Sequence, residues 1–95
     1  MALIQVTPDL LRGQANQVRQ IRDEHEAAMQ KLTSLVNNLN AIWKGEAQDA
    51  FVAQYQSMQP TFRQFSELLA EYAQKMDNTA NILEETDRSI ASQLR

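Results

Sequence analysis

The amino-acid sequence predicts an all-α fold, a helix-turn-helix hairpin that dimerises into an antiparallel four-helix bundle. The chain of 95 residues contains only two glycines, two prolines and no cysteine, so we expect few turns and no disulfide or thiolate metal site. Apolar side chains recur at helical spacing in two long segments. Between them, the stretch 41–46 contains the only tryptophan, Trp43, and the glycine Gly45. We therefore predict a single domain, residues 1–95, with its turn at 41–46.

The first helix is predicted at about residues 8–40, after an extended or disordered segment 1–6. Thr7 can accept hydrogen bonds from free backbone N–H groups, and Pro8 has the backbone angle that the first helical position requires. Asp9 suits the positive end of the helix dipole. The apolar residues that follow recur every seven positions, as in a coiled-coil seam. The seam positions are Leu11, Val18, Leu32 and Leu39, with His25 in the remaining slot.

The second helix is predicted at about residues 46–93. Glu46 and Asp49 place negative charge in its first turn, where the helix dipole favours it. Its apolar seam advances by alternating steps of four and three residues, and it continues at intervals of seven toward the C-terminus. The seam positions are Phe51, Tyr55, Met58, Phe62, Phe65, Leu69, Tyr72 and Met76.

Pro60 interrupts the second helix in the sequence. A proline inside a helix removes one backbone hydrogen bond and costs about 3 kcal/mol. The apolar seam nevertheless keeps its phase from Met58 to Phe62, so we predict one helix with a kink near Pro60. The alternative is a break into two helices at 57–60, because a residue that precedes a proline disfavours the helical conformation.

A single hairpin leaves much of this apolar surface without a partner. Each helix can bury its seam against only one neighbour, and each aromatic side chain on the seam carries roughly 150–250 Å² of surface. At ~25 cal/mol per Å², two half-exposed aromatic side chains forfeit several kcal/mol, which approaches the ~5–15 kcal/mol stability of a small domain. We therefore expect a second copy of the chain to cover the seam.

Composition and motifs argue against several classes of function. A net charge of −3 and a scattered set of basic residues disfavour nucleic-acid binding. With one histidine, no phosphate-binding loop and no metal-ligand pair in the sequence, we expect neither an enzyme nor a cofactor. No apolar run approaches the ~20 residues of a membrane span, so stable membrane insertion is not expected. His25 is expected to be a packed seam residue, and a pH-sensing role is the alternative.

The chain resembles the WXG family, the small type VII (ESX/Ess) secretion substrates that are early-secretory-antigenic-target-like. The resemblance rests on the chain length, the Thr7-Pro8 helix start, the Trp43-Lys44-Gly45 turn between two helices, and the absence of a signal peptide. It implies a helical dimer that is made in the cytoplasm and secreted without a cleavable signal.

A second motif lies near the C-terminus, where Leu83, Asp87, Ile90 and Leu94 follow one another at steps of four, three and four. These steps place the four residues on one face of a helix. The pattern resembles that of Firmicutes-type members. Tyr72 lacks an acid four residues later, which departs from the mycobacterial pattern and favours the homodimeric branch. The alternative is that the motif is only the end of the apolar seam, with Asp87 as an exposed acid.

The resemblance implies that the two motifs act together as an export signal. In an antiparallel dimer, Trp43 and Gly45 of one chain would lie near the C-terminal motif of its partner, and the membrane ATPase of the secretion system would read the combined face. Alternatively, Trp43 only plugs the end of the bundle, and Gly45 only supplies a backbone conformation. The sequence leaves both interpretations open.

The function implied is that of a secreted, non-enzymatic homodimer, acting as a substrate or effector of type VII secretion or as an export escort for a larger co-secreted effector. The alternative is a heterodimerising chaperone or adaptor for a larger toxin of the same system. A third hypothesis is a membrane-active protein that exposes its apolar seam at low pH, which the acidic composition and the dimer interface disfavour.

Overall fold

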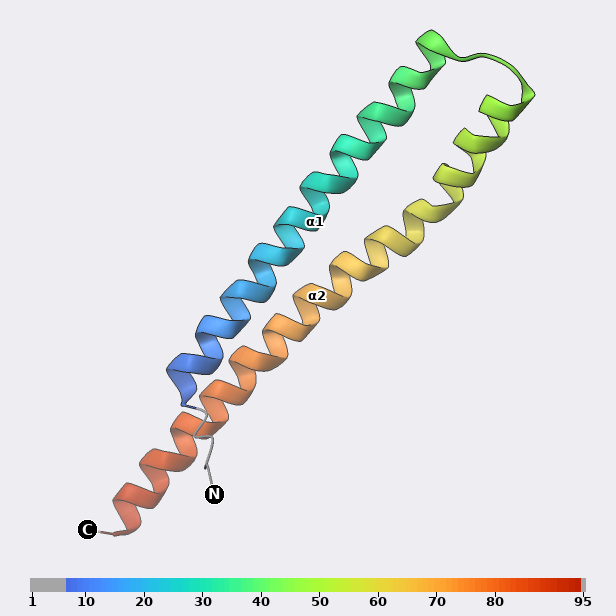
Figure 1. Ribbon diagram of the computed structural model, residues 1–95. Helices are drawn as coiled ribbons and strands as arrows, with labels where there is room; N and C mark the ends of the chain where they lie inside the picture. Colours follow the sequence, from blue (N-terminus) through green and yellow to red (C-terminus); the bar gives the residue numbers. More distant parts are fainter. Residues whose placement is uncertain (1–6, 95) are drawn as a thin grey trace, which may run out of the picture.

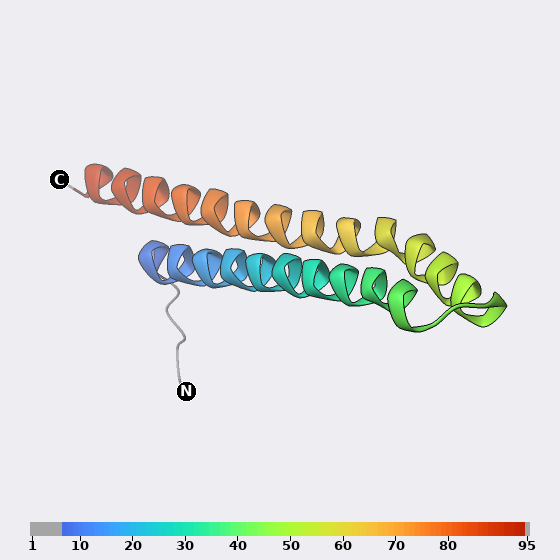
Figure 2. The same cartoon turned by 90° about the horizontal axis from the view of Figure 1, so that it is seen from above.

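The computed structural model describes residues 7–94, which form two long helices joined by a short connection (Figure 1). Helix α1 spans Pro8–Ile42 and helix α2 spans Glu46–Gln93. They lie antiparallel and side by side in both views (Figure 1, Figure 2), in a rod of 76 × 24 × 21 Å. This confirms the predicted all-α helical hairpin. The prediction for residues 1–6 lies outside the described residues.

Helix α1 begins at the Thr7-Pro8 pair. The side-chain oxygen of Thr7 accepts a hydrogen bond from the backbone N–H of Leu10 at 3.1 Å, and the backbone oxygen of Thr7 accepts one from Leu11 at 3.0 Å. Pro8 occupies a first-turn position, where its missing N–H costs nothing. The cap thus satisfies the free N–H of Leu10, and the Leu11 bond is the first regular backbone bond of the helix.

The connection between the helices is shorter than the predicted turn at 41–46. Helix α1 continues through Ile42, and helix α2 already begins at Glu46. The extra residues stay helical because the end of α1 is held in place. The N–H of Trp43 donates to the backbone oxygen of Leu39 at 2.8 Å. The side-chain amide of the buried Gln48 donates to Asn40 across the two helices.

Helix α2 runs without interruption through Pro60 and bends there rather than breaking. Both views show α2 bowing in the segment around Pro60 (Figure 1, Figure 2). Because a proline has no N–H to donate to the preceding turn, the helix loses one backbone bond at this point. One turn earlier, Ser57 donates its hydroxyl to the backbone oxygen of Gln54 at 2.6 Å, a contact that also favours bending.

Few side chains are buried within one hairpin. The buried apolar residues of the described chain are Ala15, Val36, Tyr55, Ala73 and Ala80. All residues of the predicted first-helix seam are half-buried, as are Phe62, Leu69 and Met76 of the second. Four large side chains of the second seam are exposed to solvent: Phe51, Met58, Phe65 and Tyr72. One chain therefore buries only part of its apolar surface.

Polar contacts close one edge of the interface between the helices. Five residues of α1, spaced seven apart, each contact a polar residue of α2, and we call these five pairs the polar ladder. The pairs are Arg12–Glu84, Arg19–Asp77, Glu26–Ser66, Thr33–Tyr55 and Asn40–Gln48. The ladder spans residues 12–40 of α1 but residues 48–84 of α2. The matching segment of α2 is therefore longer than that of α1, in agreement with the bowed course of α2.

The other edge of the interface is apolar. The residues immediately before the ladder positions of α1 project about 100° around the helix from the ladder. Among them, the ring of His25 lies edge-on to Phe65 with centroids 5.0 Å apart. Leu11 lines a hollow together with Tyr72 and Met76. We call this side, with its exposed α2 side chains, the apolar edge.

We expect the ladder to make folding sensitive to acid. The pKa of Glu84 is held below its usual value of 4.5 by the hydrogen bond and the charge of Arg12. A carboxyl group with a lowered pKa stabilises the fold above its unfolded pKa, and this contribution is lost as the pH falls through the lowered pKa. In urea unfolding from neutral pH to about pH 3, Glu84→Gln should therefore lower stability at neutral pH and weaken its pH dependence. Glu85→Gln is the control, and an equal response of both variants would contradict a role for the ladder.

Candidate functional site

The turn presents an apolar tip. Trp43 follows α1 in an extended conformation, and its side chain is 40% exposed. Its ring lies beside that of Phe51, with centroids 6.2 Å apart and planes tilted by 48°. Ile42, the last residue of α1, is 82% exposed. The turn thus joins Trp43 to the first residue of the predicted second seam, and it leaves both rings accessible.

Gly45 is required by the backbone rather than by space. Its φ of 138° and ψ of 178° lie in a region that is essentially restricted to glycine. A Cβ atom at this position would meet no atom within 4 Å. Its backbone oxygen accepts the first hydrogen bond of α2, from the N–H of Asp49 at 3.0 Å. The sharp change of direction between the helices therefore depends on this residue.

The C-terminal motif lies on the last turns of α2, which extend beyond the start of α1 (Figure 1, Figure 2). Leu83 is half-buried, whereas Asp87 is exposed. Ile90 is 51% and Leu94 82% exposed. Within residues 7–94, Asp87 forms no ion pair; the neighbouring Arg88 pairs with Glu84 at 2.8 Å instead. The carboxylate of Asp87 is therefore accessible, between the half-buried Leu83 and the exposed Ile90.

One chain does not bring its two motifs together. The Trp43–Gly45 turn and the C-terminal motif occupy opposite ends of a rod 76 Å long (Figure 1). Residues 46–82 of α2 lie between them. A face that combines both motifs consequently requires a second molecule, placed antiparallel to the first.

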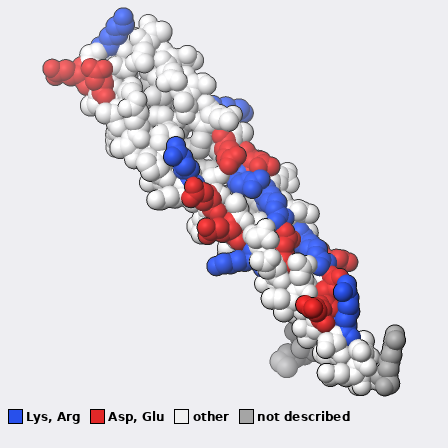
Figure 3. Space-filling view, turned by 180° about the vertical axis from the view of Figure 1, so that it is seen from behind, with Lys and Arg blue, Asp and Glu red and all other residues white. Residues whose placement is uncertain are grey.

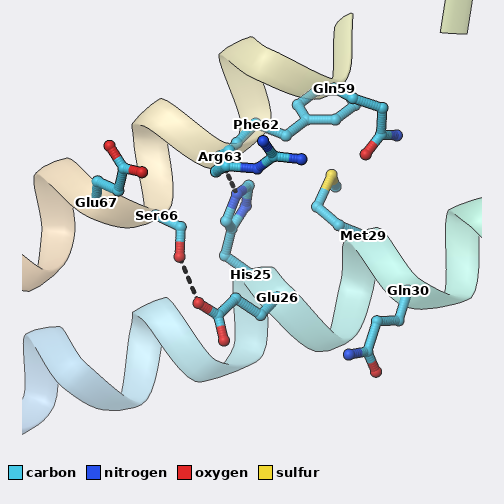
Figure 4. Close-up of a pocket in the computed structure, with 9 residues that line it drawn as sticks. All are labelled: His25, Glu26, Met29, Gln30, Gln59, Phe62, Arg63, Ser66 and Glu67. Carbon is cyan, nitrogen blue, oxygen red and sulfur yellow. Dashed lines mark hydrogen bonds between the residues drawn. The ribbon is translucent and has the colours of Figure 1, made fainter. Parts of the chain in front are cut away.

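A cleft of about 320 Å³ opens between the helices close to the bend at Pro60 (Figure 4). Its lining residues are His25, Glu26, Met29, Gln30, Gln59, Phe62, Arg63, Ser66 and Glu67. The imidazole Nε2 of His25 lies 3.2 Å from the backbone oxygen of Phe62, and Ser66 donates its hydroxyl to Glu26 at 2.6 Å. His25 is thus a half-buried residue between the helices.

Sequence patterns had not indicated the polar ladder or the cleft. The signal for the ladder was present, since polar residues recur every seven positions from Arg12 to Asn40, directly after the apolar seam positions. Pairing them with α2, however, needs the path of the bent helix. Within residues 7–94, no cluster of three or more histidine or acidic residues could hold a metal ion. In the same part of the chain, neither helix has a stretch apolar enough to cross a membrane.

Comparison with known proteins finds extensive similarity. The family model WXG100, described as proteins of 100 residues with WXG, matches residues 3–88. Protein YukE of Bacillus subtilis (strain 168) is 39% identical over 93 residues, which cover 98% of this chain and 96% of YukE. Type VII secretion system extracellular protein A of Staphylococcus aureus (strain USA300) is 28% identical over 92 residues, covering 97% and 95% of the two chains.

Solved structures share the fold. The structure of EsxA from Geobacillus thermodenitrificans superimposes with a TM-score of 0.83 at 39% identity, covering 95% of this chain and 99% of the other. The secreted protein EsxB of Bacillus anthracis, in a mutant form, has a TM-score of 0.81 at 24% identity, covering 92% and 97%. At that lower identity, the likeness to EsxB concerns the fold alone.

The two glycines should respond oppositely to replacement by alanine. Gly45→Ala should lower the free energy of unfolding by about 1–3 kcal/mol, because alanine does not adopt this backbone conformation without strain. Gly13→Ala should raise it by up to about 1 kcal/mol, since Gly13 lies inside α1 and an added Cβ would meet nothing within 4 Å. Urea unfolding of both variants measures the difference. A Gly45→Ala variant as stable as the wild type would contradict the backbone requirement.

Proposed function

This chain belongs to the WXG100 family, and from that premise we propose that it is a non-enzymatic helical protein exported by a type VII secretion system. The main support is the similarity over nearly the full length to a protein whose name places it outside the cell through that system. The exposed motifs at both ends of the hairpin add to this support. In this proposal the protein is made in the cytoplasm and acts outside the cell.

The proposed active form is an antiparallel homodimer. The apolar edge exposes four large α2 side chains whose spacing of seven residues matches helix-to-helix packing: Phe51, Met58, Phe65 and Tyr72. A two-fold symmetric pair of hairpins is the simplest closed arrangement that covers this edge on both copies. On the opposite edge, the polar side chains of the ladder already contact one another within the chain. This favours pairing of two copies through the apolar edge.

In this dimer, the turn of one chain meets the C-terminal segment of the other. Trp43 and Gly45 of one copy then lie next to the C-terminal motif of the other copy. That motif consists of Leu83, Asp87, Ile90 and Leu94. The combined surface has accessible apolar side chains around an unpaired carboxylate, a combination suited to protein recognition. We assign it as the export signal that the membrane ATPase of the system reads.

The alternative function is that of a heterodimerising adaptor for a larger co-secreted effector or toxin. In that case the same apolar edge would pack against a helical hairpin of a different protein. The homodimer is preferred because this edge is apolar along both helices, so it is complementary to itself when a second copy is turned antiparallel. The mass of the purified protein separates the two cases.

We expect light scattering of the purified protein at micromolar concentration to give the mass of two chains. Phe65→Glu should shift the mass toward one chain, because it places a charge at the centre of the apolar edge. Gln64→Glu adds the same charge one position away, about 100° around the helix, and should leave the dimer intact. A wild-type mass of one chain would exclude the homodimer.

Export itself is tested by mass spectrometry of culture supernatants. Wild-type protein should be present in the medium and absent when the secretion ATPase is deleted. Trp43→Ala and Asp87→Ala should each reduce export at least tenfold, because each removes a part of the signal, while the proteins remain dimeric and helical inside the cell. Glu85→Ala, an acid on another face of the same helix, is the control. Normal secretion of both signal variants would refute the composite signal.

A further inference from the structure

Helix α2 exposes a continuous line of large apolar side chains. Between residues 46 and 82, every exposed large apolar side chain of α2 lies at one of ten positions that advance by alternating steps of three and four residues. We call these ten positions, from 51 to 82, the outer seam. Its six apolar members are 44–63% exposed and are Phe51, Met58, Phe65, Leu68, Tyr72 and Ile82.

Exposure alone does not account for this line. The other exposed residues of α2 between 51 and 82 are polar or charged residues, alanine or proline. Large apolar side chains are thus confined to one line along the helix, although other lines are equally accessible. The remaining four positions of the outer seam are also exposed and hold Gln54, Thr61, Lys75 and Thr79. An exposed apolar line with this heptad spacing is typical of a surface that another helix covers.

The outer seam is separate from the contact between α1 and α2. Toward α1, helix α2 presents buried side chains that include Ala73 and Ala80. Tyr72 and Thr79 of the outer seam directly precede these two alanines, so they project about 100° around the helix from them. Helix α2 therefore has two packing faces, and only one of them is occupied within the chain.

The outer seam is complementary to itself when it is reversed. Read from either end, its ten positions give the same alternation of three and four residues. Two antiparallel α2 helices can therefore interlock along the whole seam. In this full-length register, Phe51 of one copy lies level with Ile82 of the other. Phe65 lies level with Leu68 in the same way, and the polar Gln54 lies level with Thr79.

A shift of the register by one heptad removes the match of both phenylalanines. In one direction Phe51 would face Lys75, and Phe65 would face Thr61. In the other direction Phe51 would face Ser89, and Phe65 would face Lys75. Of these three registers, only the full-length one lets both rings pack on an exposed aliphatic side chain.

A hollow on the outer seam has the form that helix pairing requires. Its volume is about 360 Å³, and Leu11 of α1 closes one side of it. The α2 residues that line it follow the spacing of a hole for one side chain of a facing helix, and they are Tyr72, Lys75, Met76 and Thr79. In the full-length register Met58 of the second copy lies level with this hollow. A methionine side chain is flexible enough to fill it.

The outer seam also avoids unfavourable charge contacts. Positions 51–61 carry no charge, and Figure 3 shows a largely white part of the rod next to the charged tip on the face that it draws. Lys75 is the one charged member of the outer seam. Opposite Met58 of the second copy, its aliphatic stem can lie on the thioether while the ammonium group stays at the edge of the interface. No two charged side chains of the outer seam therefore face each other.

We propose that α2 of one copy pairs antiparallel with α2 of a second copy along the outer seam, in the full-length register. This pairing rests on the homodimer proposed above and identifies the helix at its centre and the residues that set its register. Counting back from Phe51, Ala47 at the start of α2 lies level with Thr86 of the second copy. The turn that precedes α2 then reaches the C-terminal motif of that copy, so the register determines whether the two export motifs meet.

Disulfide cross-linking tests the register directly, since the chain has no cysteine of its own. The variant Gln54→Cys/Thr79→Cys keeps all six apolar members of the outer seam. Its two thiols are roughly 37 Å apart along one helix, so any disulfide that forms joins two chains. We expect mild oxidation of the purified full-length variant to convert most chains into covalent dimers.

Three further variants are matched controls. Gln54→Cys/Tyr72→Cys and Gln54→Cys/Thr86→Cys report the registers shifted by one heptad, and both should cross-link far less. Gln54→Cys/Asn78→Cys places the second thiol on a neighbouring face and measures random collisions. Light scattering of the wild type and of the reduced variants shows whether the dimer is present.

These outcomes separate the register from the dimer itself. A dimer that cross-links best through Tyr72→Cys or Thr86→Cys, or no better through Thr79→Cys than through Asn78→Cys, would overturn the proposed register and leave the homodimer standing. A wild-type mass of one chain would overturn both.

A double-mutant cycle checks the register without cysteines. Phe51→Ala and Ile82→Ala should each raise the Kd of the dimer at least tenfold in sedimentation equilibrium, because each removes a large side chain from the interface. The two residues lie roughly 46 Å apart within one helix, so any coupling between them arises between copies. The double variant should raise the Kd by less than the product of the single effects.

Met58→Ala combined with Ile82→Ala is the control for this cycle, and its effects should multiply. Circular dichroism verifies that every variant remains helical. Coupling of Ile82 with Met58 instead of Phe51, or independent effects in both cycles, would contradict the full-length register.

Discussion

The pairing of polar side chains along one edge of α1 is the interaction on which the rest of this structure depends. Surface ion pairs contribute little energy individually, about 0–1 kcal/mol each. Their effect here is geometric, because five contacts at intervals of seven residues align the two helices and satisfy one edge of their interface. The apolar residues are thereby left on the other edge. The hairpin acquires one closed side and one side that needs a partner.

Much of the fold could be predicted from the sequence because amphipathic helices place apolar residues at regular intervals along the chain. The repeat of apolar residues gave both helices, and Trp43 with Gly45 marked the connection between them. Periodicity does not indicate how deeply a residue is buried. Phe65 and Phe62 belong to one stripe in the sequence, yet Phe62 is half-buried and Phe65 is exposed. The difference arises because α2 has only one helix to pack against within the chain.

The candidate site was only partly predictable, for a related reason. Its end motifs are local patterns, readable from spacing alone. The ladder and the cleft depend on which residues of α2 lie opposite a given residue of α1, and this depends on the bend at Pro60. Because α2 follows the longer path, the register shifts between Arg19–Asp77 and Thr33–Tyr55. The sequence indicates that a proline perturbs the helix, but not how far the bend moves the register.

The uneven distribution of charge along the rod has a consequence for assembly. The uncharged part, residues 32–43 and 50–62, lies toward the turn, and most ionised side chains lie toward the termini. In an antiparallel pair, the ionised part of each copy faces the neutral part of the other, whereas a parallel pair would set ionised parts side by side. In the proposed dimer, charge segregation therefore favours the antiparallel orientation, in which few charges meet across the interface. The proposed interface would then be held by apolar contact and would be largely insensitive to ionic strength.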